Sequence, residues 1–193
     1  MAAPELPQVP RVPASDVEKL IQTIKDVGCA IITDFVPIDV VNRRNAETRP
    51  YLDADKPWKG KLFPPETRRC PRLVARSKTF REEVLVHPTV TKLTEYFLDT
   101  TTTNFYNEEK YSYTTHPIIS IATTLEINPG STAQRIHRDD QVHHNLHHDM
   151  TKTGYQLGAD TTMGFLVPGI QTTLQRALGN LNRLVTMPFS ADT

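Results

Sequence analysis

Histidines gather in one short stretch of the chain, where their spacing could support metal chemistry. Five of the seven histidines fall between positions 137 and 148. The stretch opens with His137-Arg138-Asp139, which places an imidazole and a carboxylate two residues apart. Side chains at this spacing on a strand point to the same face, so both groups could bind one metal ion. This donor pair suits Fe(II), and a third ligand from a distant strand would complete a two-histidine, one-carboxylate site.

A second interpretation of this stretch is the catalytic loop of a protein kinase. His137-Arg138-Asp139 followed by Asn145 nearly fits that loop, but the asparagine comes one residue too late. The sequence also lacks the glycine-rich loop, the Val-Ala-Ile-Lys segment and the Asp-Phe-Gly segment that kinases need. We therefore regard the match as coincidental.

A third interpretation uses the other histidines of the stretch. His143 and His147, like His144 and His148, are four residues apart and would share one face of a helix. Neither pair forms an H-E-x-x-H motif, because no glutamate follows the first histidine. A solvated polar loop beside an active site is the simpler interpretation of these four residues.

Composition limits the classes of protein. The 193 residues suffice for one domain, or for one domain with a short arm. The 22 basic and 22 acidic residues cancel, which argues against nucleic acid as a partner. The two cysteines, Cys29 and Cys70, are too few for a disulfide framework or a cysteine-based zinc site. Without a membrane-spanning run or a recognisable secretory signal, the expectation is a cytoplasmic protein with a small-molecule substrate.

The first third of the chain predicts an arm, a helix and a strand. Residues 1–14 carry four prolines and predict a solvated, polyproline-like arm. Ser15-Asp16 is typical of a helix cap, and Gly28 is expected to end that helix. The apolar run 29–32 is typical of a short strand.

Helices and a loop are predicted next. A second helix should begin at Pro37 and stop at Pro50. Residues 53–72 are charged and rich in proline and lysine, which predicts a long loop. Helical signals return over residues 73–98, with a break at His87-Pro88.

The later part of the chain favours strands. Residues 100–110 predict a polar connection, and residues 111–127 are rich in β-branched side chains that favour a strand. Asn128-Pro129-Gly130 predicts a turn, and residues 161–167 predict another strand. Helices followed by strands, without regular alternation, predict an α+β domain.

Several segments together carry a family resemblance. They are Gly-Cys-Ala-Ile-Ile-Thr-Asp-Phe at 28–35, Arg-Arg at 68–69 with 73–80, and Leu-Glu-Ile-Asn-Pro-Gly at 125–130 followed by Ala-Gln at 133–134 and His-Arg-Asp-Asp at 137–140. In these segments the chain resembles the phytanoyl-CoA dioxygenase family, in its fungal secondary-metabolism branch. Dioxygenases of fungal alkaloid pathways, including the ergot type, are the proposed sub-group.

The resemblance covers residues 15–173 and implies a fold and a reaction. The fold would be α+β, with amino-terminal helices plus an incomplete double-stranded β-helix of the jelly-roll or cupin type. The cofactors would be Fe(II) and the co-substrate 2-oxoglutarate. His137 and Asp139 would bind iron, while Gln134 and Thr173 would contact 2-oxoglutarate. The reaction would oxidise a C–H bond of a small hydrophobic metabolite such as a fungal alkaloid.

The tail at residues 174–193 departs from the family pattern. Family members continue with a distal iron-binding histidine and an arginine that pairs with 2-oxoglutarate, whereas no histidine follows His148 here. The expected organisation is therefore a partial dioxygenase domain over 15–173 and a divergent tail. The rival hypothesis is a catalytically inactive remnant that acts at most as a binding protein. The oligomeric state stays open, a homodimer included.

Overall fold

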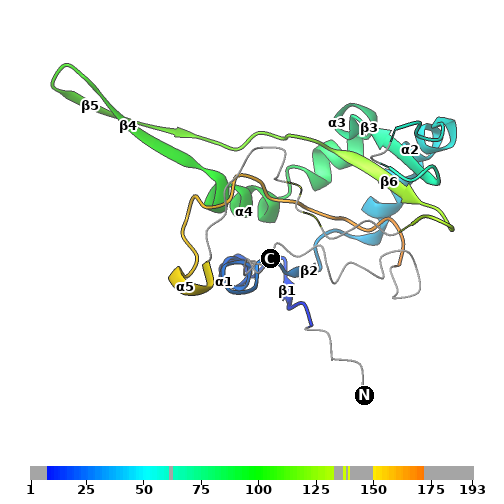
Figure 1. Cartoon of the computed structure of the whole chain (residues 1–193), viewed down its shortest axis with the longest axis horizontal. Coiled ribbons are helices and arrows are strands. Elements are labelled where there is room, and N and C mark those ends of the chain that lie inside the picture. Colours follow the sequence, from blue (N-terminus) through cyan, green and yellow to red (C-terminus); the bar gives the residue numbers. More distant parts are fainter. Residues whose placement is uncertain (1–7, 61–62, 133–136, 138, 140–149, 172–193) are drawn as a thin grey trace.

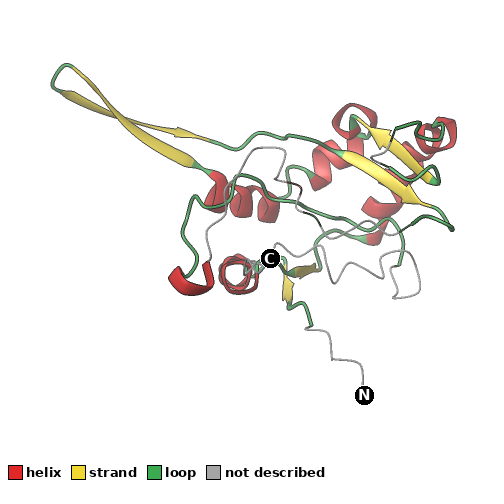
Figure 2. Ribbon diagram, viewed as in Figure 1, coloured by secondary structure: helices red, strands yellow, loops and turns green. Residues whose placement is uncertain are grey.

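Helices and three small sheets make up the described part of the chain, which comprises residues 8–60, 63–132, 137, 139 and 150–171 of this computed structural model (Figures 1 and 2). The helices are α1 (Val17–Val27), α2 (Ile38–Ala54), α3 (Leu73–Arg76), the π-helical turn η1 (Phe80–Val84), α4 (Pro88–Leu98) and α5 (Met150–Thr153). The strands are β1 (Arg11–Pro13), β2 (Ile31–Thr33), β3 (Thr67–Pro71), β4 (Thr100–Tyr106), β5 (Glu109–Thr115) and β6 (Thr123–Ile127). None of the described helices combines the length and the apolar character that crossing a membrane requires.

The segment before α1 is a strand, and it is partly buried. β1 pairs in parallel with β2, and the N–H of Ala14 donates to the carbonyl of Thr33 at 2.8 Å. The side chain of Val12 is only 1% exposed. The prediction of a solvated arm over residues 1–14 is therefore wrong for residues 11–14. Prolines remove only their own N–H groups, so the amides between them remain able to pair with a neighbouring strand.

Helix α1 begins and ends where the sequence predicts. The carboxylate of Asp16 accepts a hydrogen bond from the N–H of Lys19 at 3.1 Å, as a helix cap does. Gly28 ends the helix with a left-handed φ of 84°, and its N–H donates to the carbonyl of Ile24 at 2.8 Å. Both boundaries follow from local chemistry, and both predictions are confirmed.

The larger core lies where α1 meets α4. Its buried side chains are Val12, Leu20, Leu93 and Phe97. Tyr155, Met163 and Phe165 from the later chain also pack against it. The predicted strand at residues 161–167 is wrong, because no residue there lies in a strand. Met163 and Phe165 of this segment instead contribute to the core of the helices, where no strand partner is needed.

Helix α2 continues through the proline that the sequence predicts as its end. Pro50 lies inside the helix, which runs to Ala54. Beyond the proline, Leu52 is 6% exposed and packs in a smaller core with Cys70 and Leu73. Burial of Leu52 therefore offsets the backbone hydrogen bond that a proline cannot donate.

Replacing this proline should stabilise the protein. Pro50→Ala restores a hydrogen-bond donor within α2 and removes a steric clash, and both changes stabilise the folded state. Alanine also raises the conformational entropy of the unfolded chain, but this opposing effect is smaller. We expect the free energy of unfolding to rise by about 1–2 kcal/mol in urea denaturation. Pro37→Ala is the matched control, because Pro37 precedes the helix and should give no gain. A loss of stability in Pro50→Ala would show that the proline ring itself packs favourably.

Strand β3 replaces part of the predicted loop. β3 pairs antiparallel with β6, so that Cys70 faces Thr124. The prediction of a loop over 53–72 is therefore wrong for residues 67–71. This stretch carries charged side chains and one buried cysteine, so its strand depends on pairing with β6, which lies more than fifty residues away.

A long hairpin replaces the predicted polar connection at 100–110. β4 and β5 pair antiparallel over seven residue pairs, from Thr100 opposite Thr115 to Tyr106 opposite Glu109. Asn107 begins the turn with a left-handed φ of 53°, which asparagine tolerates. The hairpin extends away from the rest of the described chain (Figure 1).

The described elements combine helices with strands, but the strands form three separate pairs, two antiparallel and one parallel. The incomplete double-stranded β-helix therefore stays a prediction. The tail at 174–193 lies outside the described residues.

Candidate functional site

The two predicted iron ligands lie beside each other. Nε2 of His137 is 3.3 Å from Oδ1 of Asp139. The two side chains are 41% and 84% exposed, so both are accessible to an ion from solution. Neither residue lies in a strand, so the prediction that a strand aligns them is wrong. The imidazole and the carboxylate lie close together although neither residue is in a strand.

This separation fits a shared metal ion. Two ligands on adjacent positions of an octahedral ion, each about 2.1 Å from it, are about 3 Å apart. The donor set is one imidazole nitrogen and one carboxylate oxygen, which suits Fe(II). Among the residues that the structure describes, no group of three or more histidine, cysteine, aspartate or glutamate side chains could hold a metal ion.

The other predicted site residues lie outside the described residues. They are Gln134, Thr173 and the four histidines at 143, 144, 147 and 148. The contacts predicted for Gln134 and Thr173 with 2-oxoglutarate stay predictions.

A tight turn follows β6, ahead of His137 in the sequence. The side-chain amide of Asn128 donates to the carbonyl of Glu66 at 2.8 Å, which ties the turn to the segment before β3. Gly130 has a φ of +93°, a conformation that favours glycine. The turn predicted at Asn128-Pro129-Gly130 is therefore confirmed, and it fixes the point at which the chain leaves the sheet.

An ion pair anchors β6 to α2. Both terminal nitrogens of Arg49 donate to the carboxylate of Glu126, at 2.7 and 3.1 Å, and Arg49 also contacts Asp53 at 2.6 Å. The hydrogen bonds from Arg49 lower the pKa of Glu126. Such two-point contacts fix orientation, so the pair holds in a set direction the strand that precedes the predicted iron ligands in the sequence.

A second arginine holds the loop before β3. The guanidinium of Arg69 donates to both carboxylate oxygens of Asp55, at 3.0 and 3.1 Å, and lies 4.5 Å from the ring centre of Trp58. The hydrogen bonds from Arg69 lower the pKa of Asp55. Both side chains are less than a fifth exposed, so the contact stabilises the fold.

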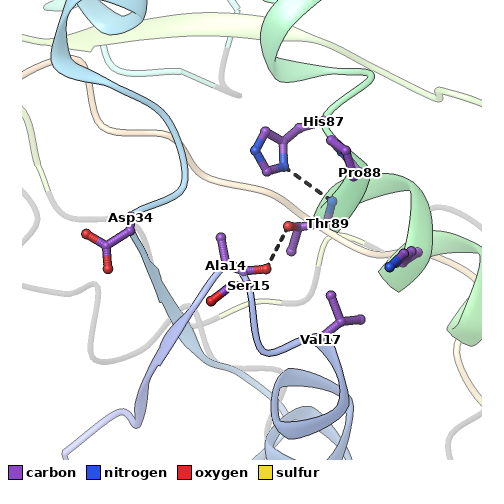
Figure 3. Close-up of a pocket in the computed structure, with 8 residues that line it drawn as sticks. Ala14, Ser15, Val17, Asp34, His87, Pro88 and Thr89 are labelled. Atoms are coloured by element: carbon purple, nitrogen blue, oxygen red, sulfur yellow. Dashed lines mark hydrogen bonds between the residues drawn. The ribbon is translucent and has the colours of Figure 1, made fainter.

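A pocket of about 330 Å³ opens beside the start of α4 (Figure 3). The residues that line it come from Ala14–Val17, from Asp34 and from the stretch between His87 and Lys92, and they include neither predicted iron ligand. Two of its lining residues, His87 and Thr89, form hydrogen bonds that stabilise the fold. The N–H of Thr89 donates to Nδ1 of His87 at 3.3 Å, and the Thr89 hydroxyl donates to the carbonyl of Ala14 at 2.9 Å. His87 thus caps α4, which confirms the predicted break at His87-Pro88.

A second histidine–carboxylate pair lies apart from the residues that the sequence predicts as a site. Nδ1 of His116 lies 3.1 Å from each carboxylate oxygen of Asp99. Asp99 precedes β4 and His116 follows β5, so the pair closes the base of the hairpin. A sequence pattern could reveal it only after the hairpin is recognised.

The chain is similar to curated fungal dioxygenases. It is 26% identical over 158 residues to dioxygenase himG of Aspergillus japonicus, an alignment that covers 81% of this chain and 48% of himG. It is 28% identical over 167 residues to dioxygenase swnH1 of Arthroderma benhamiae, covering 84% and 53% of the two chains. It is 32% identical over 149 residues to the iron/alpha-ketoglutarate-dependent dioxygenase ausO of Aspergillus calidoustus, covering 74% and 46%.

These relatives confirm the expected likeness to fungal dioxygenases. No family model matches the chain. The chain spans about half the length of the curated relatives it matches.

Proposed function

We propose that the chain is part of an iron(II)- and 2-oxoglutarate-dependent dioxygenase that oxidises a C–H bond of a small hydrophobic metabolite, such as a fungal alkaloid. The observation that carries the proposal is the 3.3 Å separation of His137 Nε2 and Asp139 Oδ1 in a chain similar to dioxygenases. One relative, ausO, is named for iron and for alpha-ketoglutarate, which is another name for 2-oxoglutarate.

His137 and Asp139 would contribute different donors to the ion. His137 would supply a neutral nitrogen donor, and the carboxylate of Asp139 would offset one of the two positive charges of Fe(II). When bound, Fe(II) with 2-oxoglutarate and oxygen supplies an oxidant that can attack an unactivated C–H bond. The turn at Asn128 and the Arg49–Glu126 contact hold the end of β6, the strand that precedes both donors in the sequence.

Exposed aliphatic side chains support a hydrophobic substrate. Ile118 and Ile121, just before β6, are 89% and 78% exposed. Leu125 and Ile127 alternate along β6 and are each 43% exposed. We propose that β3 and β6 begin the incomplete double-stranded β-helix and that this apolar face turns toward the substrate.

An anaerobic titration tests the function directly. Fe(II) and 2-oxoglutarate are added to the full chain in the absence of oxygen, and visible absorption is recorded together with the thermal midpoint. We expect a charge-transfer absorption band that needs both additions, and a higher midpoint because the ligands bind only the folded state. Succinate is the control for 2-oxoglutarate, since it lacks the keto group that chelates iron.

Two results would contradict the proposal. Fe(II) binding without a 2-oxoglutarate-dependent band would indicate a metal site that does not bind the co-substrate. An absence of both binding and band would favour the rival hypothesis of an inactive remnant.

A further inference from the structure

The β4–β5 hairpin is an exposed ribbon that has no covering element. Every residue of both seven-residue strands is exposed. Within the described part of the chain, β4 is the only strand that pairs with β5. Figure 2 shows the two strands extending together, away from the helices. A two-stranded ribbon by itself is marginally stable in water, so this one would gain stability from a partner.

The two faces of the hairpin differ in chemistry. On one face, hydroxyl groups bond across the strands: Thr101 with Thr114 at 2.8 Å, and Thr103 with Ser112 at 3.0 Å. The other face carries three tyrosines, at positions 106, 111 and 113. The rings of residues 106 and 111 are 5.4 Å apart, edge to face, and those of 111 and 113 are stacked with centres 6.4 Å apart.

The edges of this hairpin lack the usual protection against pairing. Residues 100–115 contain no proline and no glycine, and the seven residue pairs run without a bulge. Its charged residues, Glu108, Glu109 and Lys110, all lie at the tip. Natural sheets block exposed edges with prolines, bulges or charges along the strand. The middle of β5 has none of these.

We propose that the outer edge of β5 pairs antiparallel with the same edge of a second copy of the chain, with Ser112 on the two-fold axis. The result is a four-stranded antiparallel sheet in the order β4–β5–β5–β4. In this register Tyr111 of each copy lies opposite Tyr113 of the other. Tyrosines from both copies then form one row on one face, and aromatic pairs across strands stabilise a sheet.

The sequence of β5 favours a second copy as the occupant. Tyr111 and Tyr113 flank Ser112 symmetrically, so the strand complements itself when reversed. Lys110 would face Thr114, and Glu109 would face Thr115, so no like charges are opposed. The edge of β4 lacks this property. Reversal about its central residue would place Asn104, Phe105 and Tyr106 opposite threonines, so no aromatic side chains would pair.

A pair of lysine variants tests the interface. Ser112→Lys places two like charges opposite each other on the axis, whereas Thr103→Lys adds a lysine to the other strand. The two variants are matched, because each breaks the same hydroxyl contact within the hairpin. Sedimentation over a range of concentrations should show dimers for the unmodified chain and for Thr103→Lys. Ser112→Lys should dissociate at concentrations at least about fivefold higher than the control.

Cysteine trapping tests the register. Facing residues in an antiparallel pair have Cα atoms about 4.5–5.5 Å apart, within the range that a disulfide spans. In a Cys29→Ser background, Ser112→Cys should form a disulfide-linked dimer on mild oxidation, and Thr103→Cys should not. A monomer at every concentration, dimers unaffected by Ser112→Lys, or trapping through position 103 in place of 112 would each overturn the proposal.

Discussion

His137→Ala is expected to weaken Fe(II) binding by at least about 100-fold, since loss of residues that only support metal ligands already costs ten- to a hundredfold. Nε2 of His137 and Oδ1 of Asp139 are 3.3 Å apart, so the variant removes one member of the proposed donor pair. The remaining carboxylate would then hold the ion alone. Titration of the anaerobic protein with Fe(II), followed by the shift in thermal midpoint, measures the loss without any need for turnover.

The chain supplies its own control for this variant. His116 also lies beside a carboxylate, that of Asp99, at 3.1 Å. His116→Ala removes an imidazole of the same kind from the base of the hairpin and should leave Fe(II) binding unchanged. If His143→Ala or His147→Ala abolishes binding while His137→Ala does not, the metal site lies in the histidine-rich stretch and the assignment to His137 is wrong.

Elements whose boundaries depend on neighbouring residues could be predicted from the sequence. Asp16 and Gly28 define α1 because caps act on backbone groups within a few residues. Pro88 starts α4 for a similar reason, since proline suits the first turn of a helix. Pro50 shows the limit of such rules: its local cost is offset by Leu52, whose burial involves residues far along the chain.

Elements that depend on distant partners could not be predicted in the same way. β3 has only weak strand character of its own and forms opposite β6. The hairpin could have been recognised, because Thr100–Tyr106 and Glu109–Thr115 are rich in threonine and aromatic residues around a two-residue turn. The hairpin is polar on both exposed faces, so its strands lack the alternation of apolar and polar residues that usually predicts a strand.

In the candidate site, too, local features could be predicted from the sequence and contacts between distant residues could not. His137 and Asp139 are close in sequence, so a short motif sufficed to pair them, although neither residue lies in the expected strand. The predicted third ligand would come from elsewhere in the fold, and sequence spacing cannot specify such a partner. The tie between Asn128 and the carbonyl of Glu66 was equally beyond sequence reasoning, because it joins residues sixty-two positions apart.

Phe97→Ala should produce the largest loss of stability in the described chain. Phe97 is 2% exposed at the centre of the larger core, and its ring meets that of Tyr155 edge to face at 5.7 Å. Truncating a buried phenylalanine removes apolar contacts and leaves a cavity, at a cost of about 3–5 kcal/mol. That is a large part of the stability of an ordinary domain, so urea denaturation should show a much lower midpoint.

This core also connects the segment that follows the predicted metal ligands to the helices, because Tyr155, Met163 and Phe165 pack against it. Phe97→Ala should therefore loosen that segment as well as α4, and hydrogen exchange should rise in both. Phe105→Ala is the matched control, because Phe105 is 67% exposed on the hairpin and its truncation should cost less than about 0.5 kcal/mol. Equal losses in the two variants would mean that the segment after α5 does not close the core, and that contacts other than those of Phe97 hold this segment.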